Sequence, residues 1–159
     1  MKQLNFLDCE KPNMVSKYRL TLVREESFPY NTSIRNVSKA VEFLKEHLRL
    51  HQEPGEVFVA VATDPQLNPV AVFEVARGTL TEAQISMREL FKRLIISNCN
   101  SFIVGHNHPG GSERPSLDDL RTTDRIRETA KLLGITFNDH IIVTEEGYYS
   151  FAENNMLQG

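Results

Sequence analysis

Hydrophobic positions along this chain fall into short runs with the spacing of strands and longer stretches with the spacing of helices. Three apolar runs are too short for helices and rich in β-branched residues, which predicts buried strands at 57–62, 70–75 and 101–105. The first two are separated by a proline-containing loop and are expected to form a hairpin. A second hairpin is expected where the apolar segments 141–144 and 148–151 flank a Glu-Glu-Gly turn.

Apolar residues recur at helical spacing in three other segments, each preceded by a residue suited to cap a helix. The first runs from position 37 to 48 behind Asn36 and is expected to end at Pro54-Gly55. The other two begin with the capping-box pattern of a serine followed three positions later by an acidic residue: Ser86 with Glu89, and Ser116 with Asp119. The order helix, hairpin, helix, strand, helix, hairpin predicts a single-domain α/β fold, with a mixed β-sheet flanked by helices.

Residues 1–33 are predicted to be an arm ahead of this domain, which we place at residues 34–159. Periodicity is weak up to residue 16, after which Tyr18, Leu20 and Leu22 alternate with polar residues. That alternation predicts one half-exposed strand within the arm.

Composition narrows the class of protein. The chain has 159 residues, 40% hydrophobic and 25% charged, as expected for one globular domain with its own core. Its net charge is −3 and no dense Lys/Arg stripe occurs, so charge does not support nucleic acid as the main partner.

No apolar run is long enough to span a membrane and no signal peptide is evident, so we expect a cytoplasmic protein. Cys9 and Cys99 are then expected to be free thiols, with a disulfide left open.

One short motif carries the candidate chemistry. His106 and His108 come at the end of a predicted strand, followed by Ser116 and Asp119, in the spacing H-x-H-x7-S-x2-D. Two strand residues separated by one position point to the same face, so both imidazoles can reach one ion. Two histidines and one carboxylate leave the fourth position of a tetrahedral zinc ion open for water, as in catalytic zinc sites. The motif therefore predicts a zinc-dependent hydrolase.

Each part of the motif also has an ordinary structural explanation. Ser116 and Asp119 alone are the pattern of a helix cap, and His140, before an apolar run, is expected to be a core-edge histidine or a group behind the ligands. His47 and His51 lack the glutamate of H-E-x-x-H, so we expect solvated helix histidines there. The combination favours a metal site because caps do not require paired histidines nearby, and Ser116 can serve both roles.

With these residues in place, the chain resembles the RadC-like branch of the JAB/MPN metalloenzyme family, whose JAMM motif is H-x-H-x7-S-x2-D. The run His-Asn-His-Pro-Gly-Gly, followed by Arg-Pro-Ser, is similar to the H-N-H-P-S-G…P-S signature of that branch. Gly110 stands where the branch usually has Ser, and Ser86-Met87 replaces a His-Pro pair. The similarity covers residues 34–153 and includes four further segments, at 78–80, 88–92, 132–135 and 139–143.

The resemblance implies a cytidine-deaminase-like α/β fold with Zn²⁺ held by His106, His108 and Asp119. It also implies a catalytic glutamate at the start of the strand after the first helix, which here is Glu56; Glu53 and Glu74 are weaker candidates by position. Glu56 would act as general base and then general acid, and Ser116 would donate a hydrogen bond to the developing oxyanion. The expected reaction is hydrolysis of an amide or isopeptide bond.

Three functions follow from these expectations. The first is a zinc peptidase or isopeptidase acting on a protein or peptide substrate. The second is a DNA-repair or mobile-element protein acting on or near nucleic acid; the chain's charge does not favour it, and residues 1–33 are too short for the helix-hairpin-helix region often found ahead of this domain. The third is a non-catalytic MPN-type scaffold, against which the complete ligand set and Glu56 argue. The substrate and the oligomeric state are left open.

Overall fold

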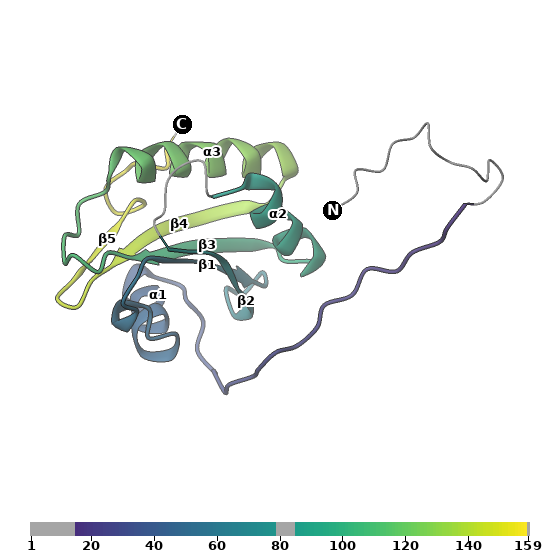
Figure 1. Cartoon of the computed structure of the whole chain (residues 1–159), viewed down its shortest axis with the longest axis horizontal. Coiled ribbons are helices and arrows are strands. Elements are labelled where there is room, and N and C mark those ends of the chain that lie inside the picture. The colour runs from purple at the N-terminus through teal and green to yellow at the C-terminus, as the bar shows by residue number, and fades with distance from the viewer. Residues whose placement is uncertain (1–14, 79–84, 159) are drawn as a thin grey trace.

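The computed structural model describes residues 15–78 and 85–158, which form a mixed sheet between two helical layers. Helices α2 (Met87–Ile96) and α3 (Leu117–Leu133) cover one face of the sheet, and α1 (Val37–Glu42) covers the other (Figure 1). This arrangement confirms the predicted single-domain α/β fold.

The sheet contains five strands in the order β2-β1-β3-β4-β5. Strands β1 (Val57–Thr63) and β2 (Pro69–Arg77) form the predicted antiparallel hairpin, and β1 also pairs antiparallel with β3 (Ser101–Asn107). Strand β3 runs parallel to β4 (Thr136–Val143), which turns back into β5 (Tyr148–Ser150). Strands β1 and β3 are buried along their whole length, as their continuous apolar character predicts. Strand β4 begins five residues before the predicted start at 141, because its parallel pairing with β3 extends back to Thr136.

Alternate residues of the strands enter two separate cores. One core lies under α1 and contains Phe43, Leu44 and the odd-numbered valines of β1. The other lies under α2 and α3 and contains even-numbered residues such as Phe58 of β1 and Val104 of β3. His106 continues the even-numbered series of β3, so its side chain lies on the face that α3 covers.

The helices begin at the predicted caps, but the first helix ends early and the second lacks the predicted capping box. The Asn36 side chain accepts a hydrogen bond from the Lys39 backbone at 2.9 Å, but α1 continues only as a π-helical turn to His47. Arg49 then adopts a left-handed conformation (φ 51°), and a 3₁₀ turn, Leu50–Gln52, follows, so the helix ends earlier than predicted. At α2, Ser86 caps the helix, but the Glu89 carboxylate binds Lys92 and Arg93 instead of completing a capping box, so that prediction is wrong.

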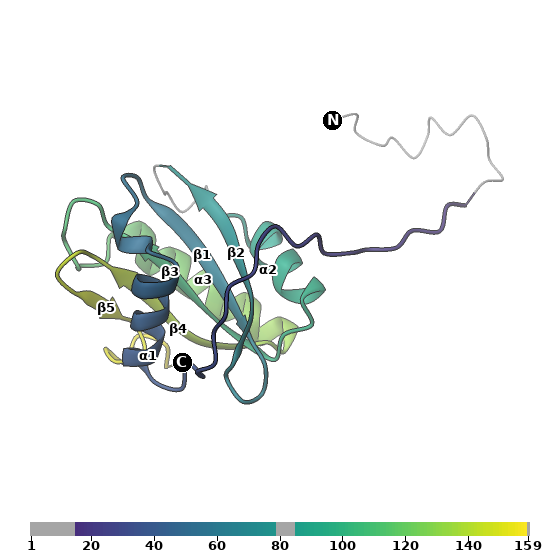
Figure 2. The ribbon, with the colours of Figure 1, turned by 90° about the horizontal axis from the view of Figure 1, so that it is seen from below.

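The strand predicted at Tyr18, Leu20 and Leu22 is not formed. Residues 15–35 are extended without regular secondary structure, and Tyr18 and Leu20 are 85% and 84% exposed. The alternation is that of a strand, but within the described part of the chain no neighbouring strand pairs with it. Figure 2 shows the start of this segment running away from the sheet and helices. Further on, Phe28 and Tyr30 pack against Phe43, and Ile34 donates a backbone hydrogen bond to Leu67 at 2.9 Å.

Two other expectations concern the chain as a whole. Among the described residues, no helix is both long enough and apolar enough to cross a bilayer. Cys99 is a free thiol, and Cys9 lies outside the described residues.

Candidate metal centre

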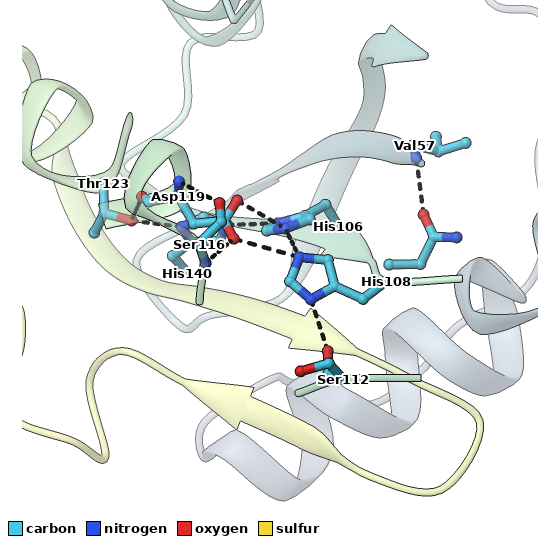
Figure 3. A network of polar contacts seen from close by, with 9 residues as sticks. Val57, His106, His108, Ser112, Ser116, Asp119, Thr123 and His140 are labelled. Carbon is cyan, nitrogen blue, oxygen red and sulfur yellow. Dashed lines mark hydrogen bonds and ion pairs between the residues drawn. The ribbon is translucent and has the colours of Figure 1, made fainter. Parts of the chain in front are cut away.

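The four residues of the motif meet where β3 ends and α3 begins. His106 is the second-last residue of β3, His108 follows just after the strand, and Asp119 lies in the first turn of α3. Figure 3 shows the two imidazole rings and the Asp119 carboxylate converging on one point. Within the described residues, these three side chains form a group that could hold a metal ion.

The distances within this group fit a tetrahedral ion. His106 Nε2 lies 3.0 Å from His108 Nε2 and 3.1 Å from Asp119 Oδ1, and His108 Nε2 lies 3.3 Å from Asp119 Oδ2. Ligand atoms about 2.0–2.1 Å from a tetrahedral zinc ion are about 3.3 Å apart. The two Asp119 contacts use different carboxylate oxygens. One ligand atom from each residue lies within 4.8 Å of the other two, so all three side chains are close enough to reach one ion.

The protonation of His108 also suits a cation. His108 Nδ1 lies 2.7 Å from the Ser112 carbonyl oxygen, which can only accept a hydrogen bond. Nδ1 must therefore carry the proton, and in the neutral ring Nε2 is a lone pair directed at Asp119. The hydrogen bond to Asp119 is the main cause of a raised His108 pKa, so a proton competes with a metal ion for this site.

Asp119 is held as a carboxylate. Burial opposes its ionisation, but polar contacts with the His106 and His108 rings, in which a bound cation would take the place of a proton, outweigh this effect and hold its pKa far below the ordinary value. The position of the carboxylate is set by a complete capping box: Ser116 N–H donates to Asp119 Oδ2 at 2.7 Å, and Asp119 N–H donates to Ser116 Oγ at 3.1 Å. The cap predicted from sequence is thus confirmed, and it orients the carboxylate towards the histidines. Because Ser116 Oγ accepts in this cap, its own proton is not used there.

Glu56 lies beside the metal group, just before the neighbouring strand. The antiparallel register pairs Phe58 with His106, and Glu56 comes directly before the first residue of β1. The charge of Glu56 contributes to the raised His108 pKa, after the larger effect of Asp119. The two weaker candidates are engaged elsewhere, because Glu53 and Glu74 both bind Arg77, at 2.7 and 2.8 Å.

Asn107, the residue between the two histidines, has a role that the sequence did not reveal. Its side chain accepts a hydrogen bond from Val57 N–H at 2.8 Å and donates to the carbonyls of Gly55 (2.9 Å) and Glu53 (3.1 Å). These bonds tie the segment that carries Glu56 to the strand that carries the histidines. The sequence offered one clue to this role: successive strand residues point to opposite faces of the sheet, so Asn107 had to face away from the side of His106.

Three histidines remain. His51 is partly buried, and its Nδ1 is buried without a hydrogen-bond partner among the described residues, so the prediction of a solvated side chain is wrong there. His47 is exposed and packs against the rings of Tyr30 and Phe43, outside the metal group. His140 is completely buried and lies behind His106, with 2.8 Å between His140 Nε2 and His106 Nδ1. It is therefore a core residue that directly contacts a candidate ligand, which combines the two interpretations of its position.

Asp139, next to His140, should make the stability of the fold depend on pH. Its carboxylate accepts hydrogen bonds from Ser150 and from the Ala152 backbone, but burial, the largest effect, raises its pKa from 3.8 to about 6. The folded chain then holds this proton more tightly than the unfolded chain, so the stabilisation is complete below about pH 4 and is lost as the pH rises through about 6. The shift corresponds to about 3 kcal/mol.

Asp139→Asn keeps an acceptor for Ala152 N–H and removes the titration. Between about pH 4 and pH 7, urea unfolding of the wild type should show a free energy that falls relative to that of the variant by about 3 kcal/mol. Parallel pH profiles for the two proteins would contradict this assignment.

Known proteins share this domain. Residues 34–156 match the RadC-like JAB domain, and because the match spans most of the chain, the protein belongs to the RadC-like JAB-domain family. The resemblance predicted from the motif is thereby confirmed.

Three bacterial relatives illustrate the similarity. The UPF0758 protein of Neisseria gonorrhoeae (strain NCCP11945) is 33% identical over 135 residues, covering 85% of this chain and 59% of the relative. That of Paraburkholderia xenovorans is 36% identical over 153 residues, covering 93% of this chain and 60% of the relative. That of Paraburkholderia phytofirmans is 38% identical over 121 residues, covering 76% and 46%. The chain thus spans between 46% and 60% of the length of these relatives.

Proposed function

We propose that this protein is a zinc-dependent hydrolase that cleaves amide or isopeptide bonds in protein or peptide substrates. The observation that carries the proposal is the group of His106, His108 and Asp119 where β3 ends, whose ligand atoms lie within 4.8 Å of one another. Two imidazoles and one carboxylate are donors that zinc accepts, and they leave a position for water, as catalytic sites do. Glu56, whose charge acts on His108, would supply the carboxylate that hydrolysis requires.

The residues divide the work according to their positions. His106, His108 and Asp119 would hold the ion, which when bound lowers the pKa of a coordinated water towards about 7 and polarises a carbonyl group. Glu56 would accept a proton from the attacking water and deliver it to the nitrogen of the leaving amine. Ser116 would donate a hydrogen bond from its hydroxyl group to the substrate carbonyl oxygen as negative charge develops there.

Access to the site follows from burial. His106 is 1% exposed, whereas His108 is only partly buried and Ser116 is exposed. A substrate carbonyl would therefore approach from the side of His108 and Ser116, where Glu56 also lies. His106 faces the protein interior, so it would contact the ion but not the substrate.

Metal content and hydrolysis together test this proposal. We expect the purified chain to contain about one zinc ion, measured by elemental analysis. A fluorogenic peptide library and an isopeptide-linked conjugate serve as substrates. Hydrolysis should stop when a chelator removes zinc and return when zinc is added.

Two outcomes would count against the proposal. A chain without stoichiometric zinc, or hydrolysis that persists in chelator, would overturn the metal-dependent mechanism. Zinc without hydrolysis of either substrate would argue against catalysis and for a metal-stabilised scaffold.

A further inference from the structure

His140 lies in β4, completely buried, with its ring stacked on Phe151 at a centroid distance of 4.7 Å and its edge against Phe58. The Phe58 and Phe151 rings have no conventional hydrogen-bond donor or acceptor, so the two nitrogens of His140 need other partners. They do: His140 Nε2 lies 2.8 Å from His106 Nδ1, and His140 Nδ1 lies 2.7 Å from Thr123 Oγ1 (Figure 3). A neutral imidazole has one N–H and one lone pair, so the two contacts must differ in direction.

Thr123 decides that direction. Its Oγ1 lies 2.7 Å from the backbone carbonyl oxygen of Asp119, one helical turn earlier. The carbonyl can only accept, so the single hydroxyl proton of Thr123 is donated to it. Thr123 Oγ1 is then the acceptor for His140, which must carry its proton on Nδ1.

The consequence reaches the metal group. With the proton on Nδ1, His140 Nε2 is a lone pair and accepts a hydrogen bond from Nδ1–H of His106. His106 Nε2 is then left as the lone pair that points at His108 and Asp119. The opposite orientation of His140 would place an N–H of His106 in the metal group, where it would exclude a cation.

We infer that Thr123 and His140 are positioning residues that fix His106 in the tautomer required for metal binding. This inference rests on the proposed metal-dependent function. Its physical basis is burial: Thr123 is 2% exposed and His140 0% exposed, so bulk water does not reach them to supply an alternative acceptor. Because Thr123 follows Asp119 by four residues on α3, one helix provides both a candidate ligand and the group that orients another.

Three variants test the inference. Thr123→Val keeps the shape of the side chain and removes its acceptor, whereas Thr123→Ser keeps the hydroxyl. Thr129→Val is the matched control, because Thr129 donates to the Arg125 carbonyl at the same distance of 2.7 Å on the same helix. The measurements are zinc affinity by competition with a chromophoric chelator, and the tautomer of His140 from imidazole ¹⁵N NMR shifts of the metal-free chain.

We expect Thr123→Val to weaken zinc affinity about 10- to 100-fold and to move His140 out of the Nδ1–H tautomer. Thr123→Ser and Thr129→Val should retain the wild-type affinity and tautomer. Wild-type affinity and tautomer in Thr123→Val would overturn the inference and leave the proposed function intact. A wild type that binds no zinc would instead overturn the proposed function, and the tautomer measurement would still decide whether Thr123 orients His140.

Discussion

Replacing Asp119 with Asn is expected to weaken zinc binding by more than about 100-fold, which is the upper end of the loss caused by changing an outer partner of a ligand. The substitution removes the one carboxylate from a group whose other members are imidazoles, with nitrogen atoms 3.1 and 3.3 Å from its oxygens. The amide oxygen of Asn can still accept the hydrogen bond from Ser116 N–H, so α3 should stay capped. Elemental analysis gives the metal content, and circular dichroism gives the helix content.

Ser116→Ala is the converse control. It removes the Oγ that accepts from Asp119 N–H, which should lower the free energy of unfolding by about 1 kcal/mol. Zinc content should be unchanged, because the backbone N–H of residue 116 still orients the carboxylate. Loss of zinc in Ser116→Ala, or full zinc retention in Asp119→Asn, would contradict the assignment of Asp119 as a ligand held by the cap.

Glu56→Gln should retain zinc and lose turnover. Glutamine has nearly the same shape but cannot accept and return a proton, and removing a positioned general base typically lowers kcat about 100- to 10,000-fold. The expected result is a wild-type zinc content with kcat reduced by that factor, measured on the same fluorogenic substrates.

Glu53→Gln and Glu74→Gln are the matched controls, because Glu53 lies three residues before Glu56, Glu74 lies on the neighbouring strand β2, and both carboxylates bind Arg77. Their exposed ion pairs contribute little, so activity should change less than about twofold. Full activity in Glu56→Gln would exclude Glu56 as the base, and a large loss in Glu53→Gln or Glu74→Gln would reassign it.

Much of the fold was predictable because its signals are local. The continuous apolar runs of β1 and β3 and the cap at Ser116 each depend on a few adjacent residues. The same holds for His106 and His108, whose spacing is that of one face of a strand. The capping box predicted at Ser86 does not form, because the Glu89 carboxylate binds Lys92 and Arg93 one turn further along the helix.

By itself, then, the sequence determined the order of the elements, the two-sided burial of the central strands and the candidate metal-binding motif at one strand end. Only the tertiary structure decided what surrounds that motif. It brought Glu56 close enough to His108 for its charge to act on that ring, and it placed His140 and Thr123 behind His106. It also left the strand-like pattern at Tyr18 to Leu22 unpaired within the described residues. The physical reason is common to all of these: periodicity and capping act within one or two turns, whereas a hydrogen bond between segments distant in sequence exists only once the chain has packed.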